Sequence, residues 1–175
     1  MRMGTRSLLF GVHQVLWHPL MVLRAWRILY GRPTWREVVC IVIHDWGYWG
    51  RADIEGVQGE RHPELGAALA GWLLGPAYRD LVLYHSRAYA ARAGRLPSRL
   101  CWADKASFVL EPAWWYLLRA RMSGELREYR AKAAAAGVVP RSATDAAWFQ
   151  GLATNLGLAS GLGEAPKPAY LRASA

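Results

Sequence analysis

The chain has 175 residues, of which 53% are hydrophobic and 10 are tryptophan. A domain of this length can bury one well-formed core, and the composition excludes a disordered chain. The net charge of +9 comes from scattered residues without a long run of like charges, so it favours a small phosphorylated ligand over specific nucleic-acid binding.

The first third of the chain is expected to be helical. Residues 7–23 carry no formal charge, but their histidines, glutamine and proline are costly in lipid, so we interpret them as a buried helix and expect no membrane span. Apolar residues recur every three or four positions as far as Leu29, after which residues 31–33 (GRP) end the helix. Pro19 either kinks this segment or marks a fresh helix start.

The rest of the chain continues the helical pattern. Thr34 and Glu37 predict a capping box for a helix that runs to about Trp46, and the glycine-rich residues 47–60 predict a loop of the kind that lines sites. Further helices are predicted over 64–74 with Pro63 as first residue, 77–93, 98–111, from 112 onward, from 123 to 136, and from Ser142 or Thr144 onward.

These elements predict an all-α fold, a compact orthogonal helical bundle in a single domain over residues 1–175. We expect a core of ligand-bearing helices over about 10–110, C-terminal helices over about 112–156 and a loose tail over about 157–175. Residues 114–116 (WWY) suit either the core or a dimer face, so a homodimer stays open. Cys40 and Cys101 lie in apolar contexts outside any CxxC pair, which favours buried free thiols and a cytoplasmic location.

A series of histidines and aspartates carries the chemistry. His44 and Asp45 close the apolar run 38–43, where a polar pair is costly unless it is satisfied. A divalent metal bound by imidazole and carboxylate would satisfy it. Neighbours on a helix diverge by about 100°, so the pair can share a metal only if the site lies over the helix end. The candidates, in chain order, are His18, His44, Asp45, His62, His85 and Asp104.

This order resembles the HD-domain superfamily of metal-dependent phosphohydrolases, over about residues 10–110. The matching segments are WHPLMVLRAW, IVIHDWG, ERHPELGAAL, LVLYHSR and LCWADKASF. The resemblance implies one or two divalent transition metal ions, of Fe, Mn, Co, Ni or Zn. It assigns His18, His44, Asp45 and Asp104 to one ion, and it makes Asp45 the bridge to a second ion held by His62 and His85. His13 competes with His18, but it lacks the Val22 and Ala25 continuation of the family segment.

The resemblance also implies an activity. It predicts a phosphohydrolase or phosphodiesterase that cleaves a phosphomonoester or phosphodiester of a nucleotide by attack of metal-bound hydroxide. Asp45, Lys105 and Arg87 are the catalytic candidates, the last two because cationic side chains next to proposed ligands could grasp phosphate. The substrate-binding candidates are Tyr48, Trp49, Arg51 and Arg61. For the cationic residues, a solvated surface role is an equal alternative.

Two departures from the family limit the assignment. The doublet is followed by Trp46-Gly47-Tyr48, no GYP signature follows, and His85 is not part of a histidine pair, so we do not assign cyclic-dinucleotide cleavage. Two alternatives remain beside the phosphohydrolase: a di-iron oxygenase of the same fold, and a non-catalytic binding protein that keeps the fold.

Overall fold

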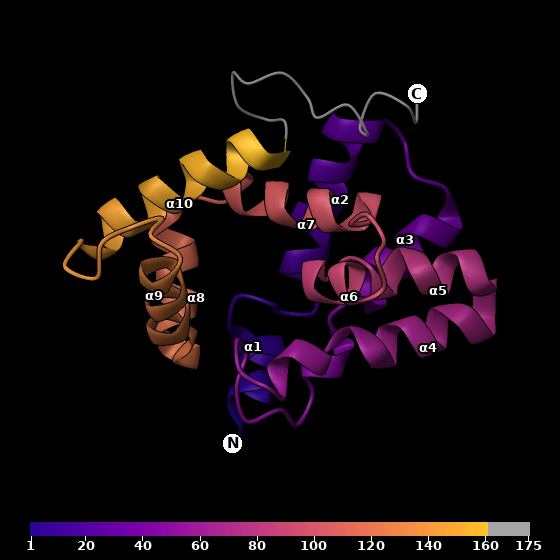
Figure 1. Cartoon of the computed structure of the whole chain (residues 1–175), viewed down its shortest axis with the longest axis horizontal. Helices are drawn as coiled ribbons and strands as arrows, with labels where there is room; N and C mark the ends of the chain where they lie inside the picture. Colours follow the sequence, from indigo (N-terminus) through magenta and orange to yellow (C-terminus); the bar gives the residue numbers. More distant parts are fainter. Residues whose placement is uncertain (161–175) are drawn as a thin grey trace.

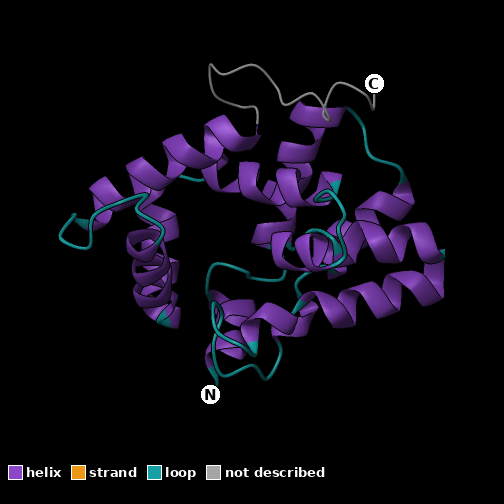
Figure 2. Cartoon of the chain, in the orientation of Figure 1, coloured by secondary structure: helices purple, strands orange, loops and turns teal. Residues whose placement is uncertain are grey.

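The computed structural model describes the backbone of residues 1–160 and the side chains of residues 1–157. All regular secondary structure in this part of the chain is helical, which confirms the predicted all-α class (Figures 1 and 2). The α-helices are α1 (Met3–Phe10), α2 (Trp17–Tyr30), α3 (Trp35–Ile43), α4 (Pro63–Leu74), α5 (Pro76–Leu83), α6 (Arg87–Arg92), α7 (Arg99–Leu110), α8 (Ala113–Ser123), α9 (Glu125–Ala135) and α10 (Asp145–Ser160). Two 3₁₀ turns, η1 (Trp46–Tyr48) and η2 (Gly59–Arg61), overlap the two ends of the loop predicted over residues 47–60.

Local capping signals set several helix boundaries. The predicted capping box is present at α3, because the Thr34 side chain accepts from the backbone N–H of Glu37, whose carboxylate accepts from the backbone N–H of Thr34. Pro63 is the first residue of α4, as expected. At α10 the cap is Thr144, whose Oγ1 accepts from the backbone N–H of Ala147 at 3.2 Å.

The helix predicted over residues 7–23 is interrupted before Pro19, because the chain leaves the helix between α1 and α2. The backbone N–H of Val12 donates to the Glu125 carboxylate at 2.9 Å, and a Cβ on Gly11 would lie 2.3 Å from that carboxylate. The Gln14 side chain then accepts from the first backbone groups of the next helix. Pro19 lies in the first turn of α2, so of its two predicted roles the fresh helix start is the observed one.

The predicted helix over residues 77–93 is also interrupted, at residues 84–86 between α5 and α6. The carbonyls at the end of α5 accept from other partners: His85 Nδ1 lies 2.5 Å from the Val82 oxygen, and Ser98 Oγ donates to the Leu81 oxygen at 2.7 Å. Because these side chains satisfy the terminal carbonyls, α5 can end where His85 turns inward.

Three apolar clusters form the core of the described residues, and α7 contributes to the two larger ones. In Figure 1, α4 and α5 lie on one side of the molecule and α8, α9 and α10 on the other, with α7 between them. The first cluster includes Trp26, Ile41 and Leu100, and the second packs Phe108 against Trp148. Asp104 therefore lies on a helix that is held from two sides.

The remaining structural predictions have mixed outcomes. Cys40 and Cys101 are buried free thiols, as predicted, and burial raises the pKa of each to about 11. Within residues 114–116, Trp114 is exposed while Tyr116 is buried in the second cluster. No helix in the described part of the chain is both long and apolar enough to cross a membrane. Helix α10 continues to Ser160, and the rest of the predicted loose tail, 161–175, lies outside the described residues.

Candidate metal centre

Asp45 lies at the centre of a buried histidine cluster, and its two carboxylate oxygens face different histidines. Oδ2 lies 3.2 Å from Nε2 of both His18 and His44. Oδ1 lies 3.5 Å from Nε2 of His85 and 3.6 Å from Nε2 of His62. One carboxylate thus joins two sets of imidazoles.

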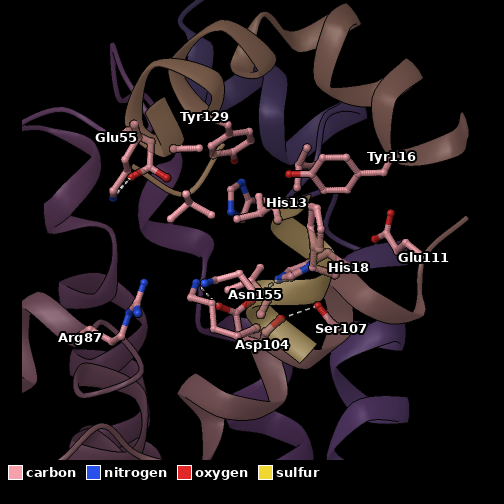
Figure 3. Close-up of a pocket in the computed structure, with 18 of the residues that line it drawn as sticks. His13, His18, Glu55, Arg87, Asp104, Ser107, Glu111, Tyr116, Tyr129 and Asn155 are labelled. Atoms are coloured by element: carbon pink, nitrogen blue, oxygen red, sulfur yellow. Dashed lines mark hydrogen bonds and ion pairs between the residues drawn. The ribbon is translucent and has the colours of Figure 1, made fainter. Parts of the chain in front are cut away.

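Asp104 completes the first set. Its Oδ1 lies 3.2 Å from His18 Nε2, and its Oδ2 accepts from Lys105 Nζ at 2.9 Å. Figure 3 shows Asp104 and His18 together at one side of a cavity. The first set is therefore His18, His44, Asp104 and Oδ2 of Asp45, and the second is His62, His85 and Oδ1 of Asp45.

Local structure brings these residues together. Helix α3 ends at Ile43, so His44 is its C-cap and Asp45 follows in a non-helical conformation, which places both side chains over the helix end as the metal hypothesis requires. Gly47 allows the backbone of His62 to approach, because a Cβ there would lie 1.9 Å from the His62 carbonyl oxygen. His62 is the N-cap of α4, and His85 lies in the break before α6.

Three of the imidazoles are oriented by backbone carbonyls. Nδ1 of His44 lies 2.7 Å from the Ile41 oxygen, Nδ1 of His62 lies 2.7 Å from the Gly59 oxygen, and Nδ1 of His85 is bonded to Val82 in the same way. A carbonyl can only accept, so each Nδ1 carries a proton, and in the neutral form of each ring the Nε2 lone pair faces Asp45. Backbone bonds of this kind commonly orient histidines that ligate metals.

The facing nitrogens give a test of whether a cation fits. Nε2 of His62 lies 3.0 Å from Nε2 of His85, and Nε2 of His18 lies 3.3 Å from Nε2 of His44. His62 and His85 each hold a proton on Nδ1, so in their neutral forms two Nε2 lone pairs face each other at 3.0 Å and repel unless a cation lies between them. Two donors that each lie about 2.1 Å from one ion are roughly 3.0–3.4 Å apart at tetrahedral to octahedral angles. The observed spacings therefore fit a shared ion.

The Asp45 carboxylate also favours a bound cation. Asp45 Oδ2 is buried and has no hydrogen bond within the described residues, a state that is costly for a carboxylate oxygen. By distance, two groups of potential donors lie close enough to hold an ion: His18, His44 and Asp104, and His44, Asp45 and His85. The protein thus contains buried His/Asp groups that could hold a metal ion.

The electrostatics of the cluster keep its carboxylates ionised. Burial opposes ionisation of Asp45, but His44, His13 and His18 hold the pKa of its carboxyl well below the usual range. Burial likewise opposes ionisation of Asp104, but Lys105 and His18 hold the pKa of its carboxyl well below the usual range. Burial opposes protonation of His18 as well, but Asp104 and Asp45 outweigh it and raise the pKa of the imidazole to about 10. Burial and the neighbouring His85 lower the pKa of His62 well below its ordinary value, so this ring is neutral at pH 7.

His13 lies outside the inner cluster. Its Nε2 is 3.9 Å from Asp45 Oδ2, while its Nδ1 lies 3.1 Å from Glu125 Oε1. His18, by contrast, contacts both Asp45 and Asp104 at 3.2 Å. Of the two histidines that compete for the first position, His18 is therefore the one placed to ligate, and His13 is oriented by Glu125 beside it.

Sequence reasoning missed Glu125, which lies in the first turn of α9. The Glu125 carboxylate is fully buried and accepts from Ser7 Oγ at 2.6 Å, from Tyr129 at 2.9 Å and from Ser123. Helix α9 thereby holds the segment between α1 and α2, and with it His13. No local signal marks this role, because the donors at Ser7 and Val12 are more than a hundred residues away.

We expect Glu125→Gln to lower the free energy of unfolding at pH 7 by about 3 kcal/mol, because the hydrogen bonds to a charged acceptor are lost. Burial raises the pKa of this carboxyl, but His13, Ser123 and Ser7 outweigh it and lower the pKa below 4.5. The stability that ionised Glu125 contributes is therefore present above about pH 4.5, and it is lost as the pH falls through the folded-state pKa of this carboxyl.

Urea unfolding of the wild type and the variant from pH 3 to pH 7 measures this difference. Glu64→Gln, at a surface ion pair with Arg61, is the control and should change stability by less than about 1 kcal/mol. The hydrogen-bond network assigned to Glu125 would be contradicted if Glu125→Gln lowered stability no more than Glu64→Gln does. A loss of stability that grows at low pH would also contradict it.

Two neighbouring cavities, which share seven lining residues, are lined in part by the cluster. The smaller, of about 140 Å³, is lined by Asp45, His62 and His85, and the larger, of about 360 Å³, by His13 and His18. The residues that line both are His13, Tyr48, Glu55, Arg87, Asp104, Lys105 and Lys132. The two catalytic cations predicted from the sequence, Arg87 and Lys105, thus lie at the junction of the cavities.

The four predicted substrate-binding residues separate into two groups. Tyr48 is buried, lines both cavities and stacks on His62 with ring centroids 4.2 Å apart. Trp49 is 63% exposed, Arg51 Nε donates to the Gly47 oxygen, and Arg61 pairs with Glu64 at the surface. Neither cavity is lined by any of these last three.

No protein-family model matches this chain, and no curated protein and no solved structure matches it. The resemblance to HD-domain proteins thus rests on the sequence motifs alone, and the function has to be argued from the geometry of the site.

Proposed function

We propose that this protein is a dinuclear metal-dependent phosphohydrolase that cleaves a phosphomonoester or phosphodiester. The observation that supports the proposal most strongly is the division of the Asp45 carboxylate, with Oδ2 toward His18 and His44 and Oδ1 toward His62 and His85. A bridging carboxylate between two imidazole sets is suited to two adjacent cations. When bound, such ions lower the pKa of a water ligand and neutralise charge on phosphoryl oxygens.

The cations around the site suit a phosphate group. Arg87 lines both cavities and has no hydrogen bond or ion pair within the described residues, so its guanidinium is free to bind an anion in two-pronged fashion. Lys105 instead holds Asp104, and that carboxylate raises the pKa of the ammonium group. We therefore assign Arg87 to the substrate phosphate and Lys105 to the orientation of Asp104.

A hydrolysis assay that detects the released alcohol as well as inorganic phosphate tests the proposal, because a phosphodiester yields an alcohol and a phosphomonoester. The protein is loaded separately with Mn²⁺, Fe²⁺, Co²⁺, Ni²⁺ or Zn²⁺ and assayed anaerobically against a panel of phosphomonoesters and phosphodiesters. We expect hydrolysis with at least one metal and no requirement for oxygen. Oxygen consumption by the iron form, without hydrolysis in any form, would replace the proposal with the oxygenase alternative. Bound metal without either reaction would support the binding-protein alternative.

We expect Arg87→Ala to raise KM for the best phosphoester about 10- to 100-fold, because one charge-assisted contact is lost, while the bound metal is unchanged. Arg79→Ala is the matched control, since Arg79 is an exposed arginine that pairs with Asp80 and lines neither cavity. Steady-state kinetics and metal analysis of both variants provide the measurement. An unchanged KM in Arg87→Ala would remove this residue from the phosphate site.

A further inference from the structure

The larger cavity has two chemically different ends. Its polar end is formed by His18, Asp104, Lys105 and Arg87, next to the metal cluster. Figure 3 shows Tyr116 and Tyr129 across the cavity from Asp104 and Arg87. The far wall comes from α7, α9 and α10 and the turn after α9, and its apolar residues include Phe108, Ala133, Val138, Leu152 and Leu156.

Most polar side chains in the far wall already have partners. Ser107 Oγ donates to the Asp104 backbone oxygen at 2.6 Å, and the Glu111 carboxylate is paired with Arg119. Tyr129 donates to Glu125, and Lys132 pairs with Glu55. In the described part of this wall, Tyr116 and Asn155 are the polar residues left to bond a nucleobase or a sugar, which would otherwise lose its hydrogen bonds to water.

The size of the cavity suits a small amphipathic molecule. A volume of about 360 Å³ lies in the range of roughly 300–1,000 Å³ that is typical of small-ligand sites. One end offers cations to an anionic group, and the other offers apolar surface, whose burial contributes about 25 cal/mol per Å². The second apolar cluster, which includes Phe108 and Trp148, backs this wall.

We propose that the substrate carries its phosphate on an apolar chain or ring, and that this apolar part occupies the larger cavity. The placement of the phosphate beside the cluster rests on the proposed function, but the apolar preference rests on the cavity itself. Affinity should then increase with the length of an alkyl chain attached to the anionic group, by about fourfold per methylene until the cavity is filled.

The test uses n-alkylphosphonates from methyl to octyl, which cannot be hydrolysed as esters, and measures their Kd for the metal-loaded full chain by calorimetry. We expect rising affinity along the series and weaker binding of adenosine monophosphate than of octylphosphonate. Leu152→Trp fills part of the cavity and should weaken octylphosphonate binding at least tenfold. Thr154→Trp, on the exposed side of the same helix and outside the cavity, is the matched control and should bind as the wild type does.

A flat affinity series, tighter binding of the nucleotide, or an effect of Thr154→Trp equal to that of Leu152→Trp would overturn the inference. Failure of the proposed function gives a different result: chain-length-dependent binding of the phosphonates, with no phosphate released from the matching alkyl phosphates under any metal. In that case the apolar preference stands and the hydrolase assignment falls.

Discussion

Asp45→Ala is expected to reduce the metal content from two ions per chain to none and phosphate release by about a thousandfold or more. Among the described residues, Asp45 is the one whose carboxylate faces both imidazole sets, with Oδ2 at 3.2 Å from His18 and His44 and Oδ1 at 3.5 Å from His85. Its removal leaves the second set without a carboxylate and the first set with Asp104 alone. Elemental analysis of the purified variant and a phosphate-release assay measure the two losses.

The matched control for that variant is Asp80→Ala, which removes an aspartate of the same size from a surface ion pair with Arg79. It should retain both metals and full turnover. If Asp45→Ala kept two ions per chain, or kept wild-type activity, Asp45 could not be the bridge and the dinuclear proposal would be wrong.

His85→Ala is expected to reduce the metal content from two ions to one while the protein stays folded. His85 belongs to the second set alone, where its Nε2 lies 3.0 Å from Nε2 of His62 and 3.5 Å from Asp45 Oδ1. The first set keeps two imidazoles, Asp104 and Oδ2 of Asp45. With one ion lost, we expect a fall in turnover of about 100-fold, since charge on the phosphoryl oxygens is then only partly neutralised.

His18→Ala is the reciprocal variant, because His18 contacts Asp104 and Asp45 Oδ2 in the first set. His18→Ala should lose the ion of the first set and keep the ion of the second. Metal analysis and circular dichroism of both variants separate loss of metal from loss of fold. If His85→Ala still bound two ions per chain, the cluster would not divide as proposed. The same would follow if the one ion left in each variant were held by the same residues.

Helix boundaries set by local chemistry could be predicted from the sequence, and those set by distant residues could not. Thr34 and Glu37 form their capping box within one turn, so the start of α3 was predictable. The break before α2 depends on the Glu125 carboxylate, which accepts from the Val12 backbone across 113 residues. Likewise, the end of α5 depends on Ser98, whose hydroxyl donates to the Leu81 oxygen across 17 residues.

The candidate ligands were predicted from their order along the chain, and the structure brings all six together. The sequence does not show which groups orient these ligands. The carbonyls of Ile41, Gly59 and Val82 hold three imidazoles, and they belong to residues that no motif singles out. The network of Glu125 and His13 is likewise built from contacts that are distant in the sequence.

The predicted substrate-binding loop shows the same limit. Tyr48 and Trp49 are adjacent aromatic residues, and their sequence contexts do not distinguish them. The η1 turn directs Tyr48 inward onto His62, while Trp49 is 63% exposed. The apolar cavity wall could not be predicted either, because its residues come from α7, α9 and α10, which are separate in the sequence.

Anomalous X-ray diffraction from crystals loaded with Mn²⁺ tests the central claim most directly. The proposed dinuclear centre predicts two peaks, one on each side of the Asp45 carboxylate, the first among His18, His44 and Asp104 and the second beside His62 and His85. A map without a peak at this cluster, under conditions in which the solution protein has bound its metal, would contradict it.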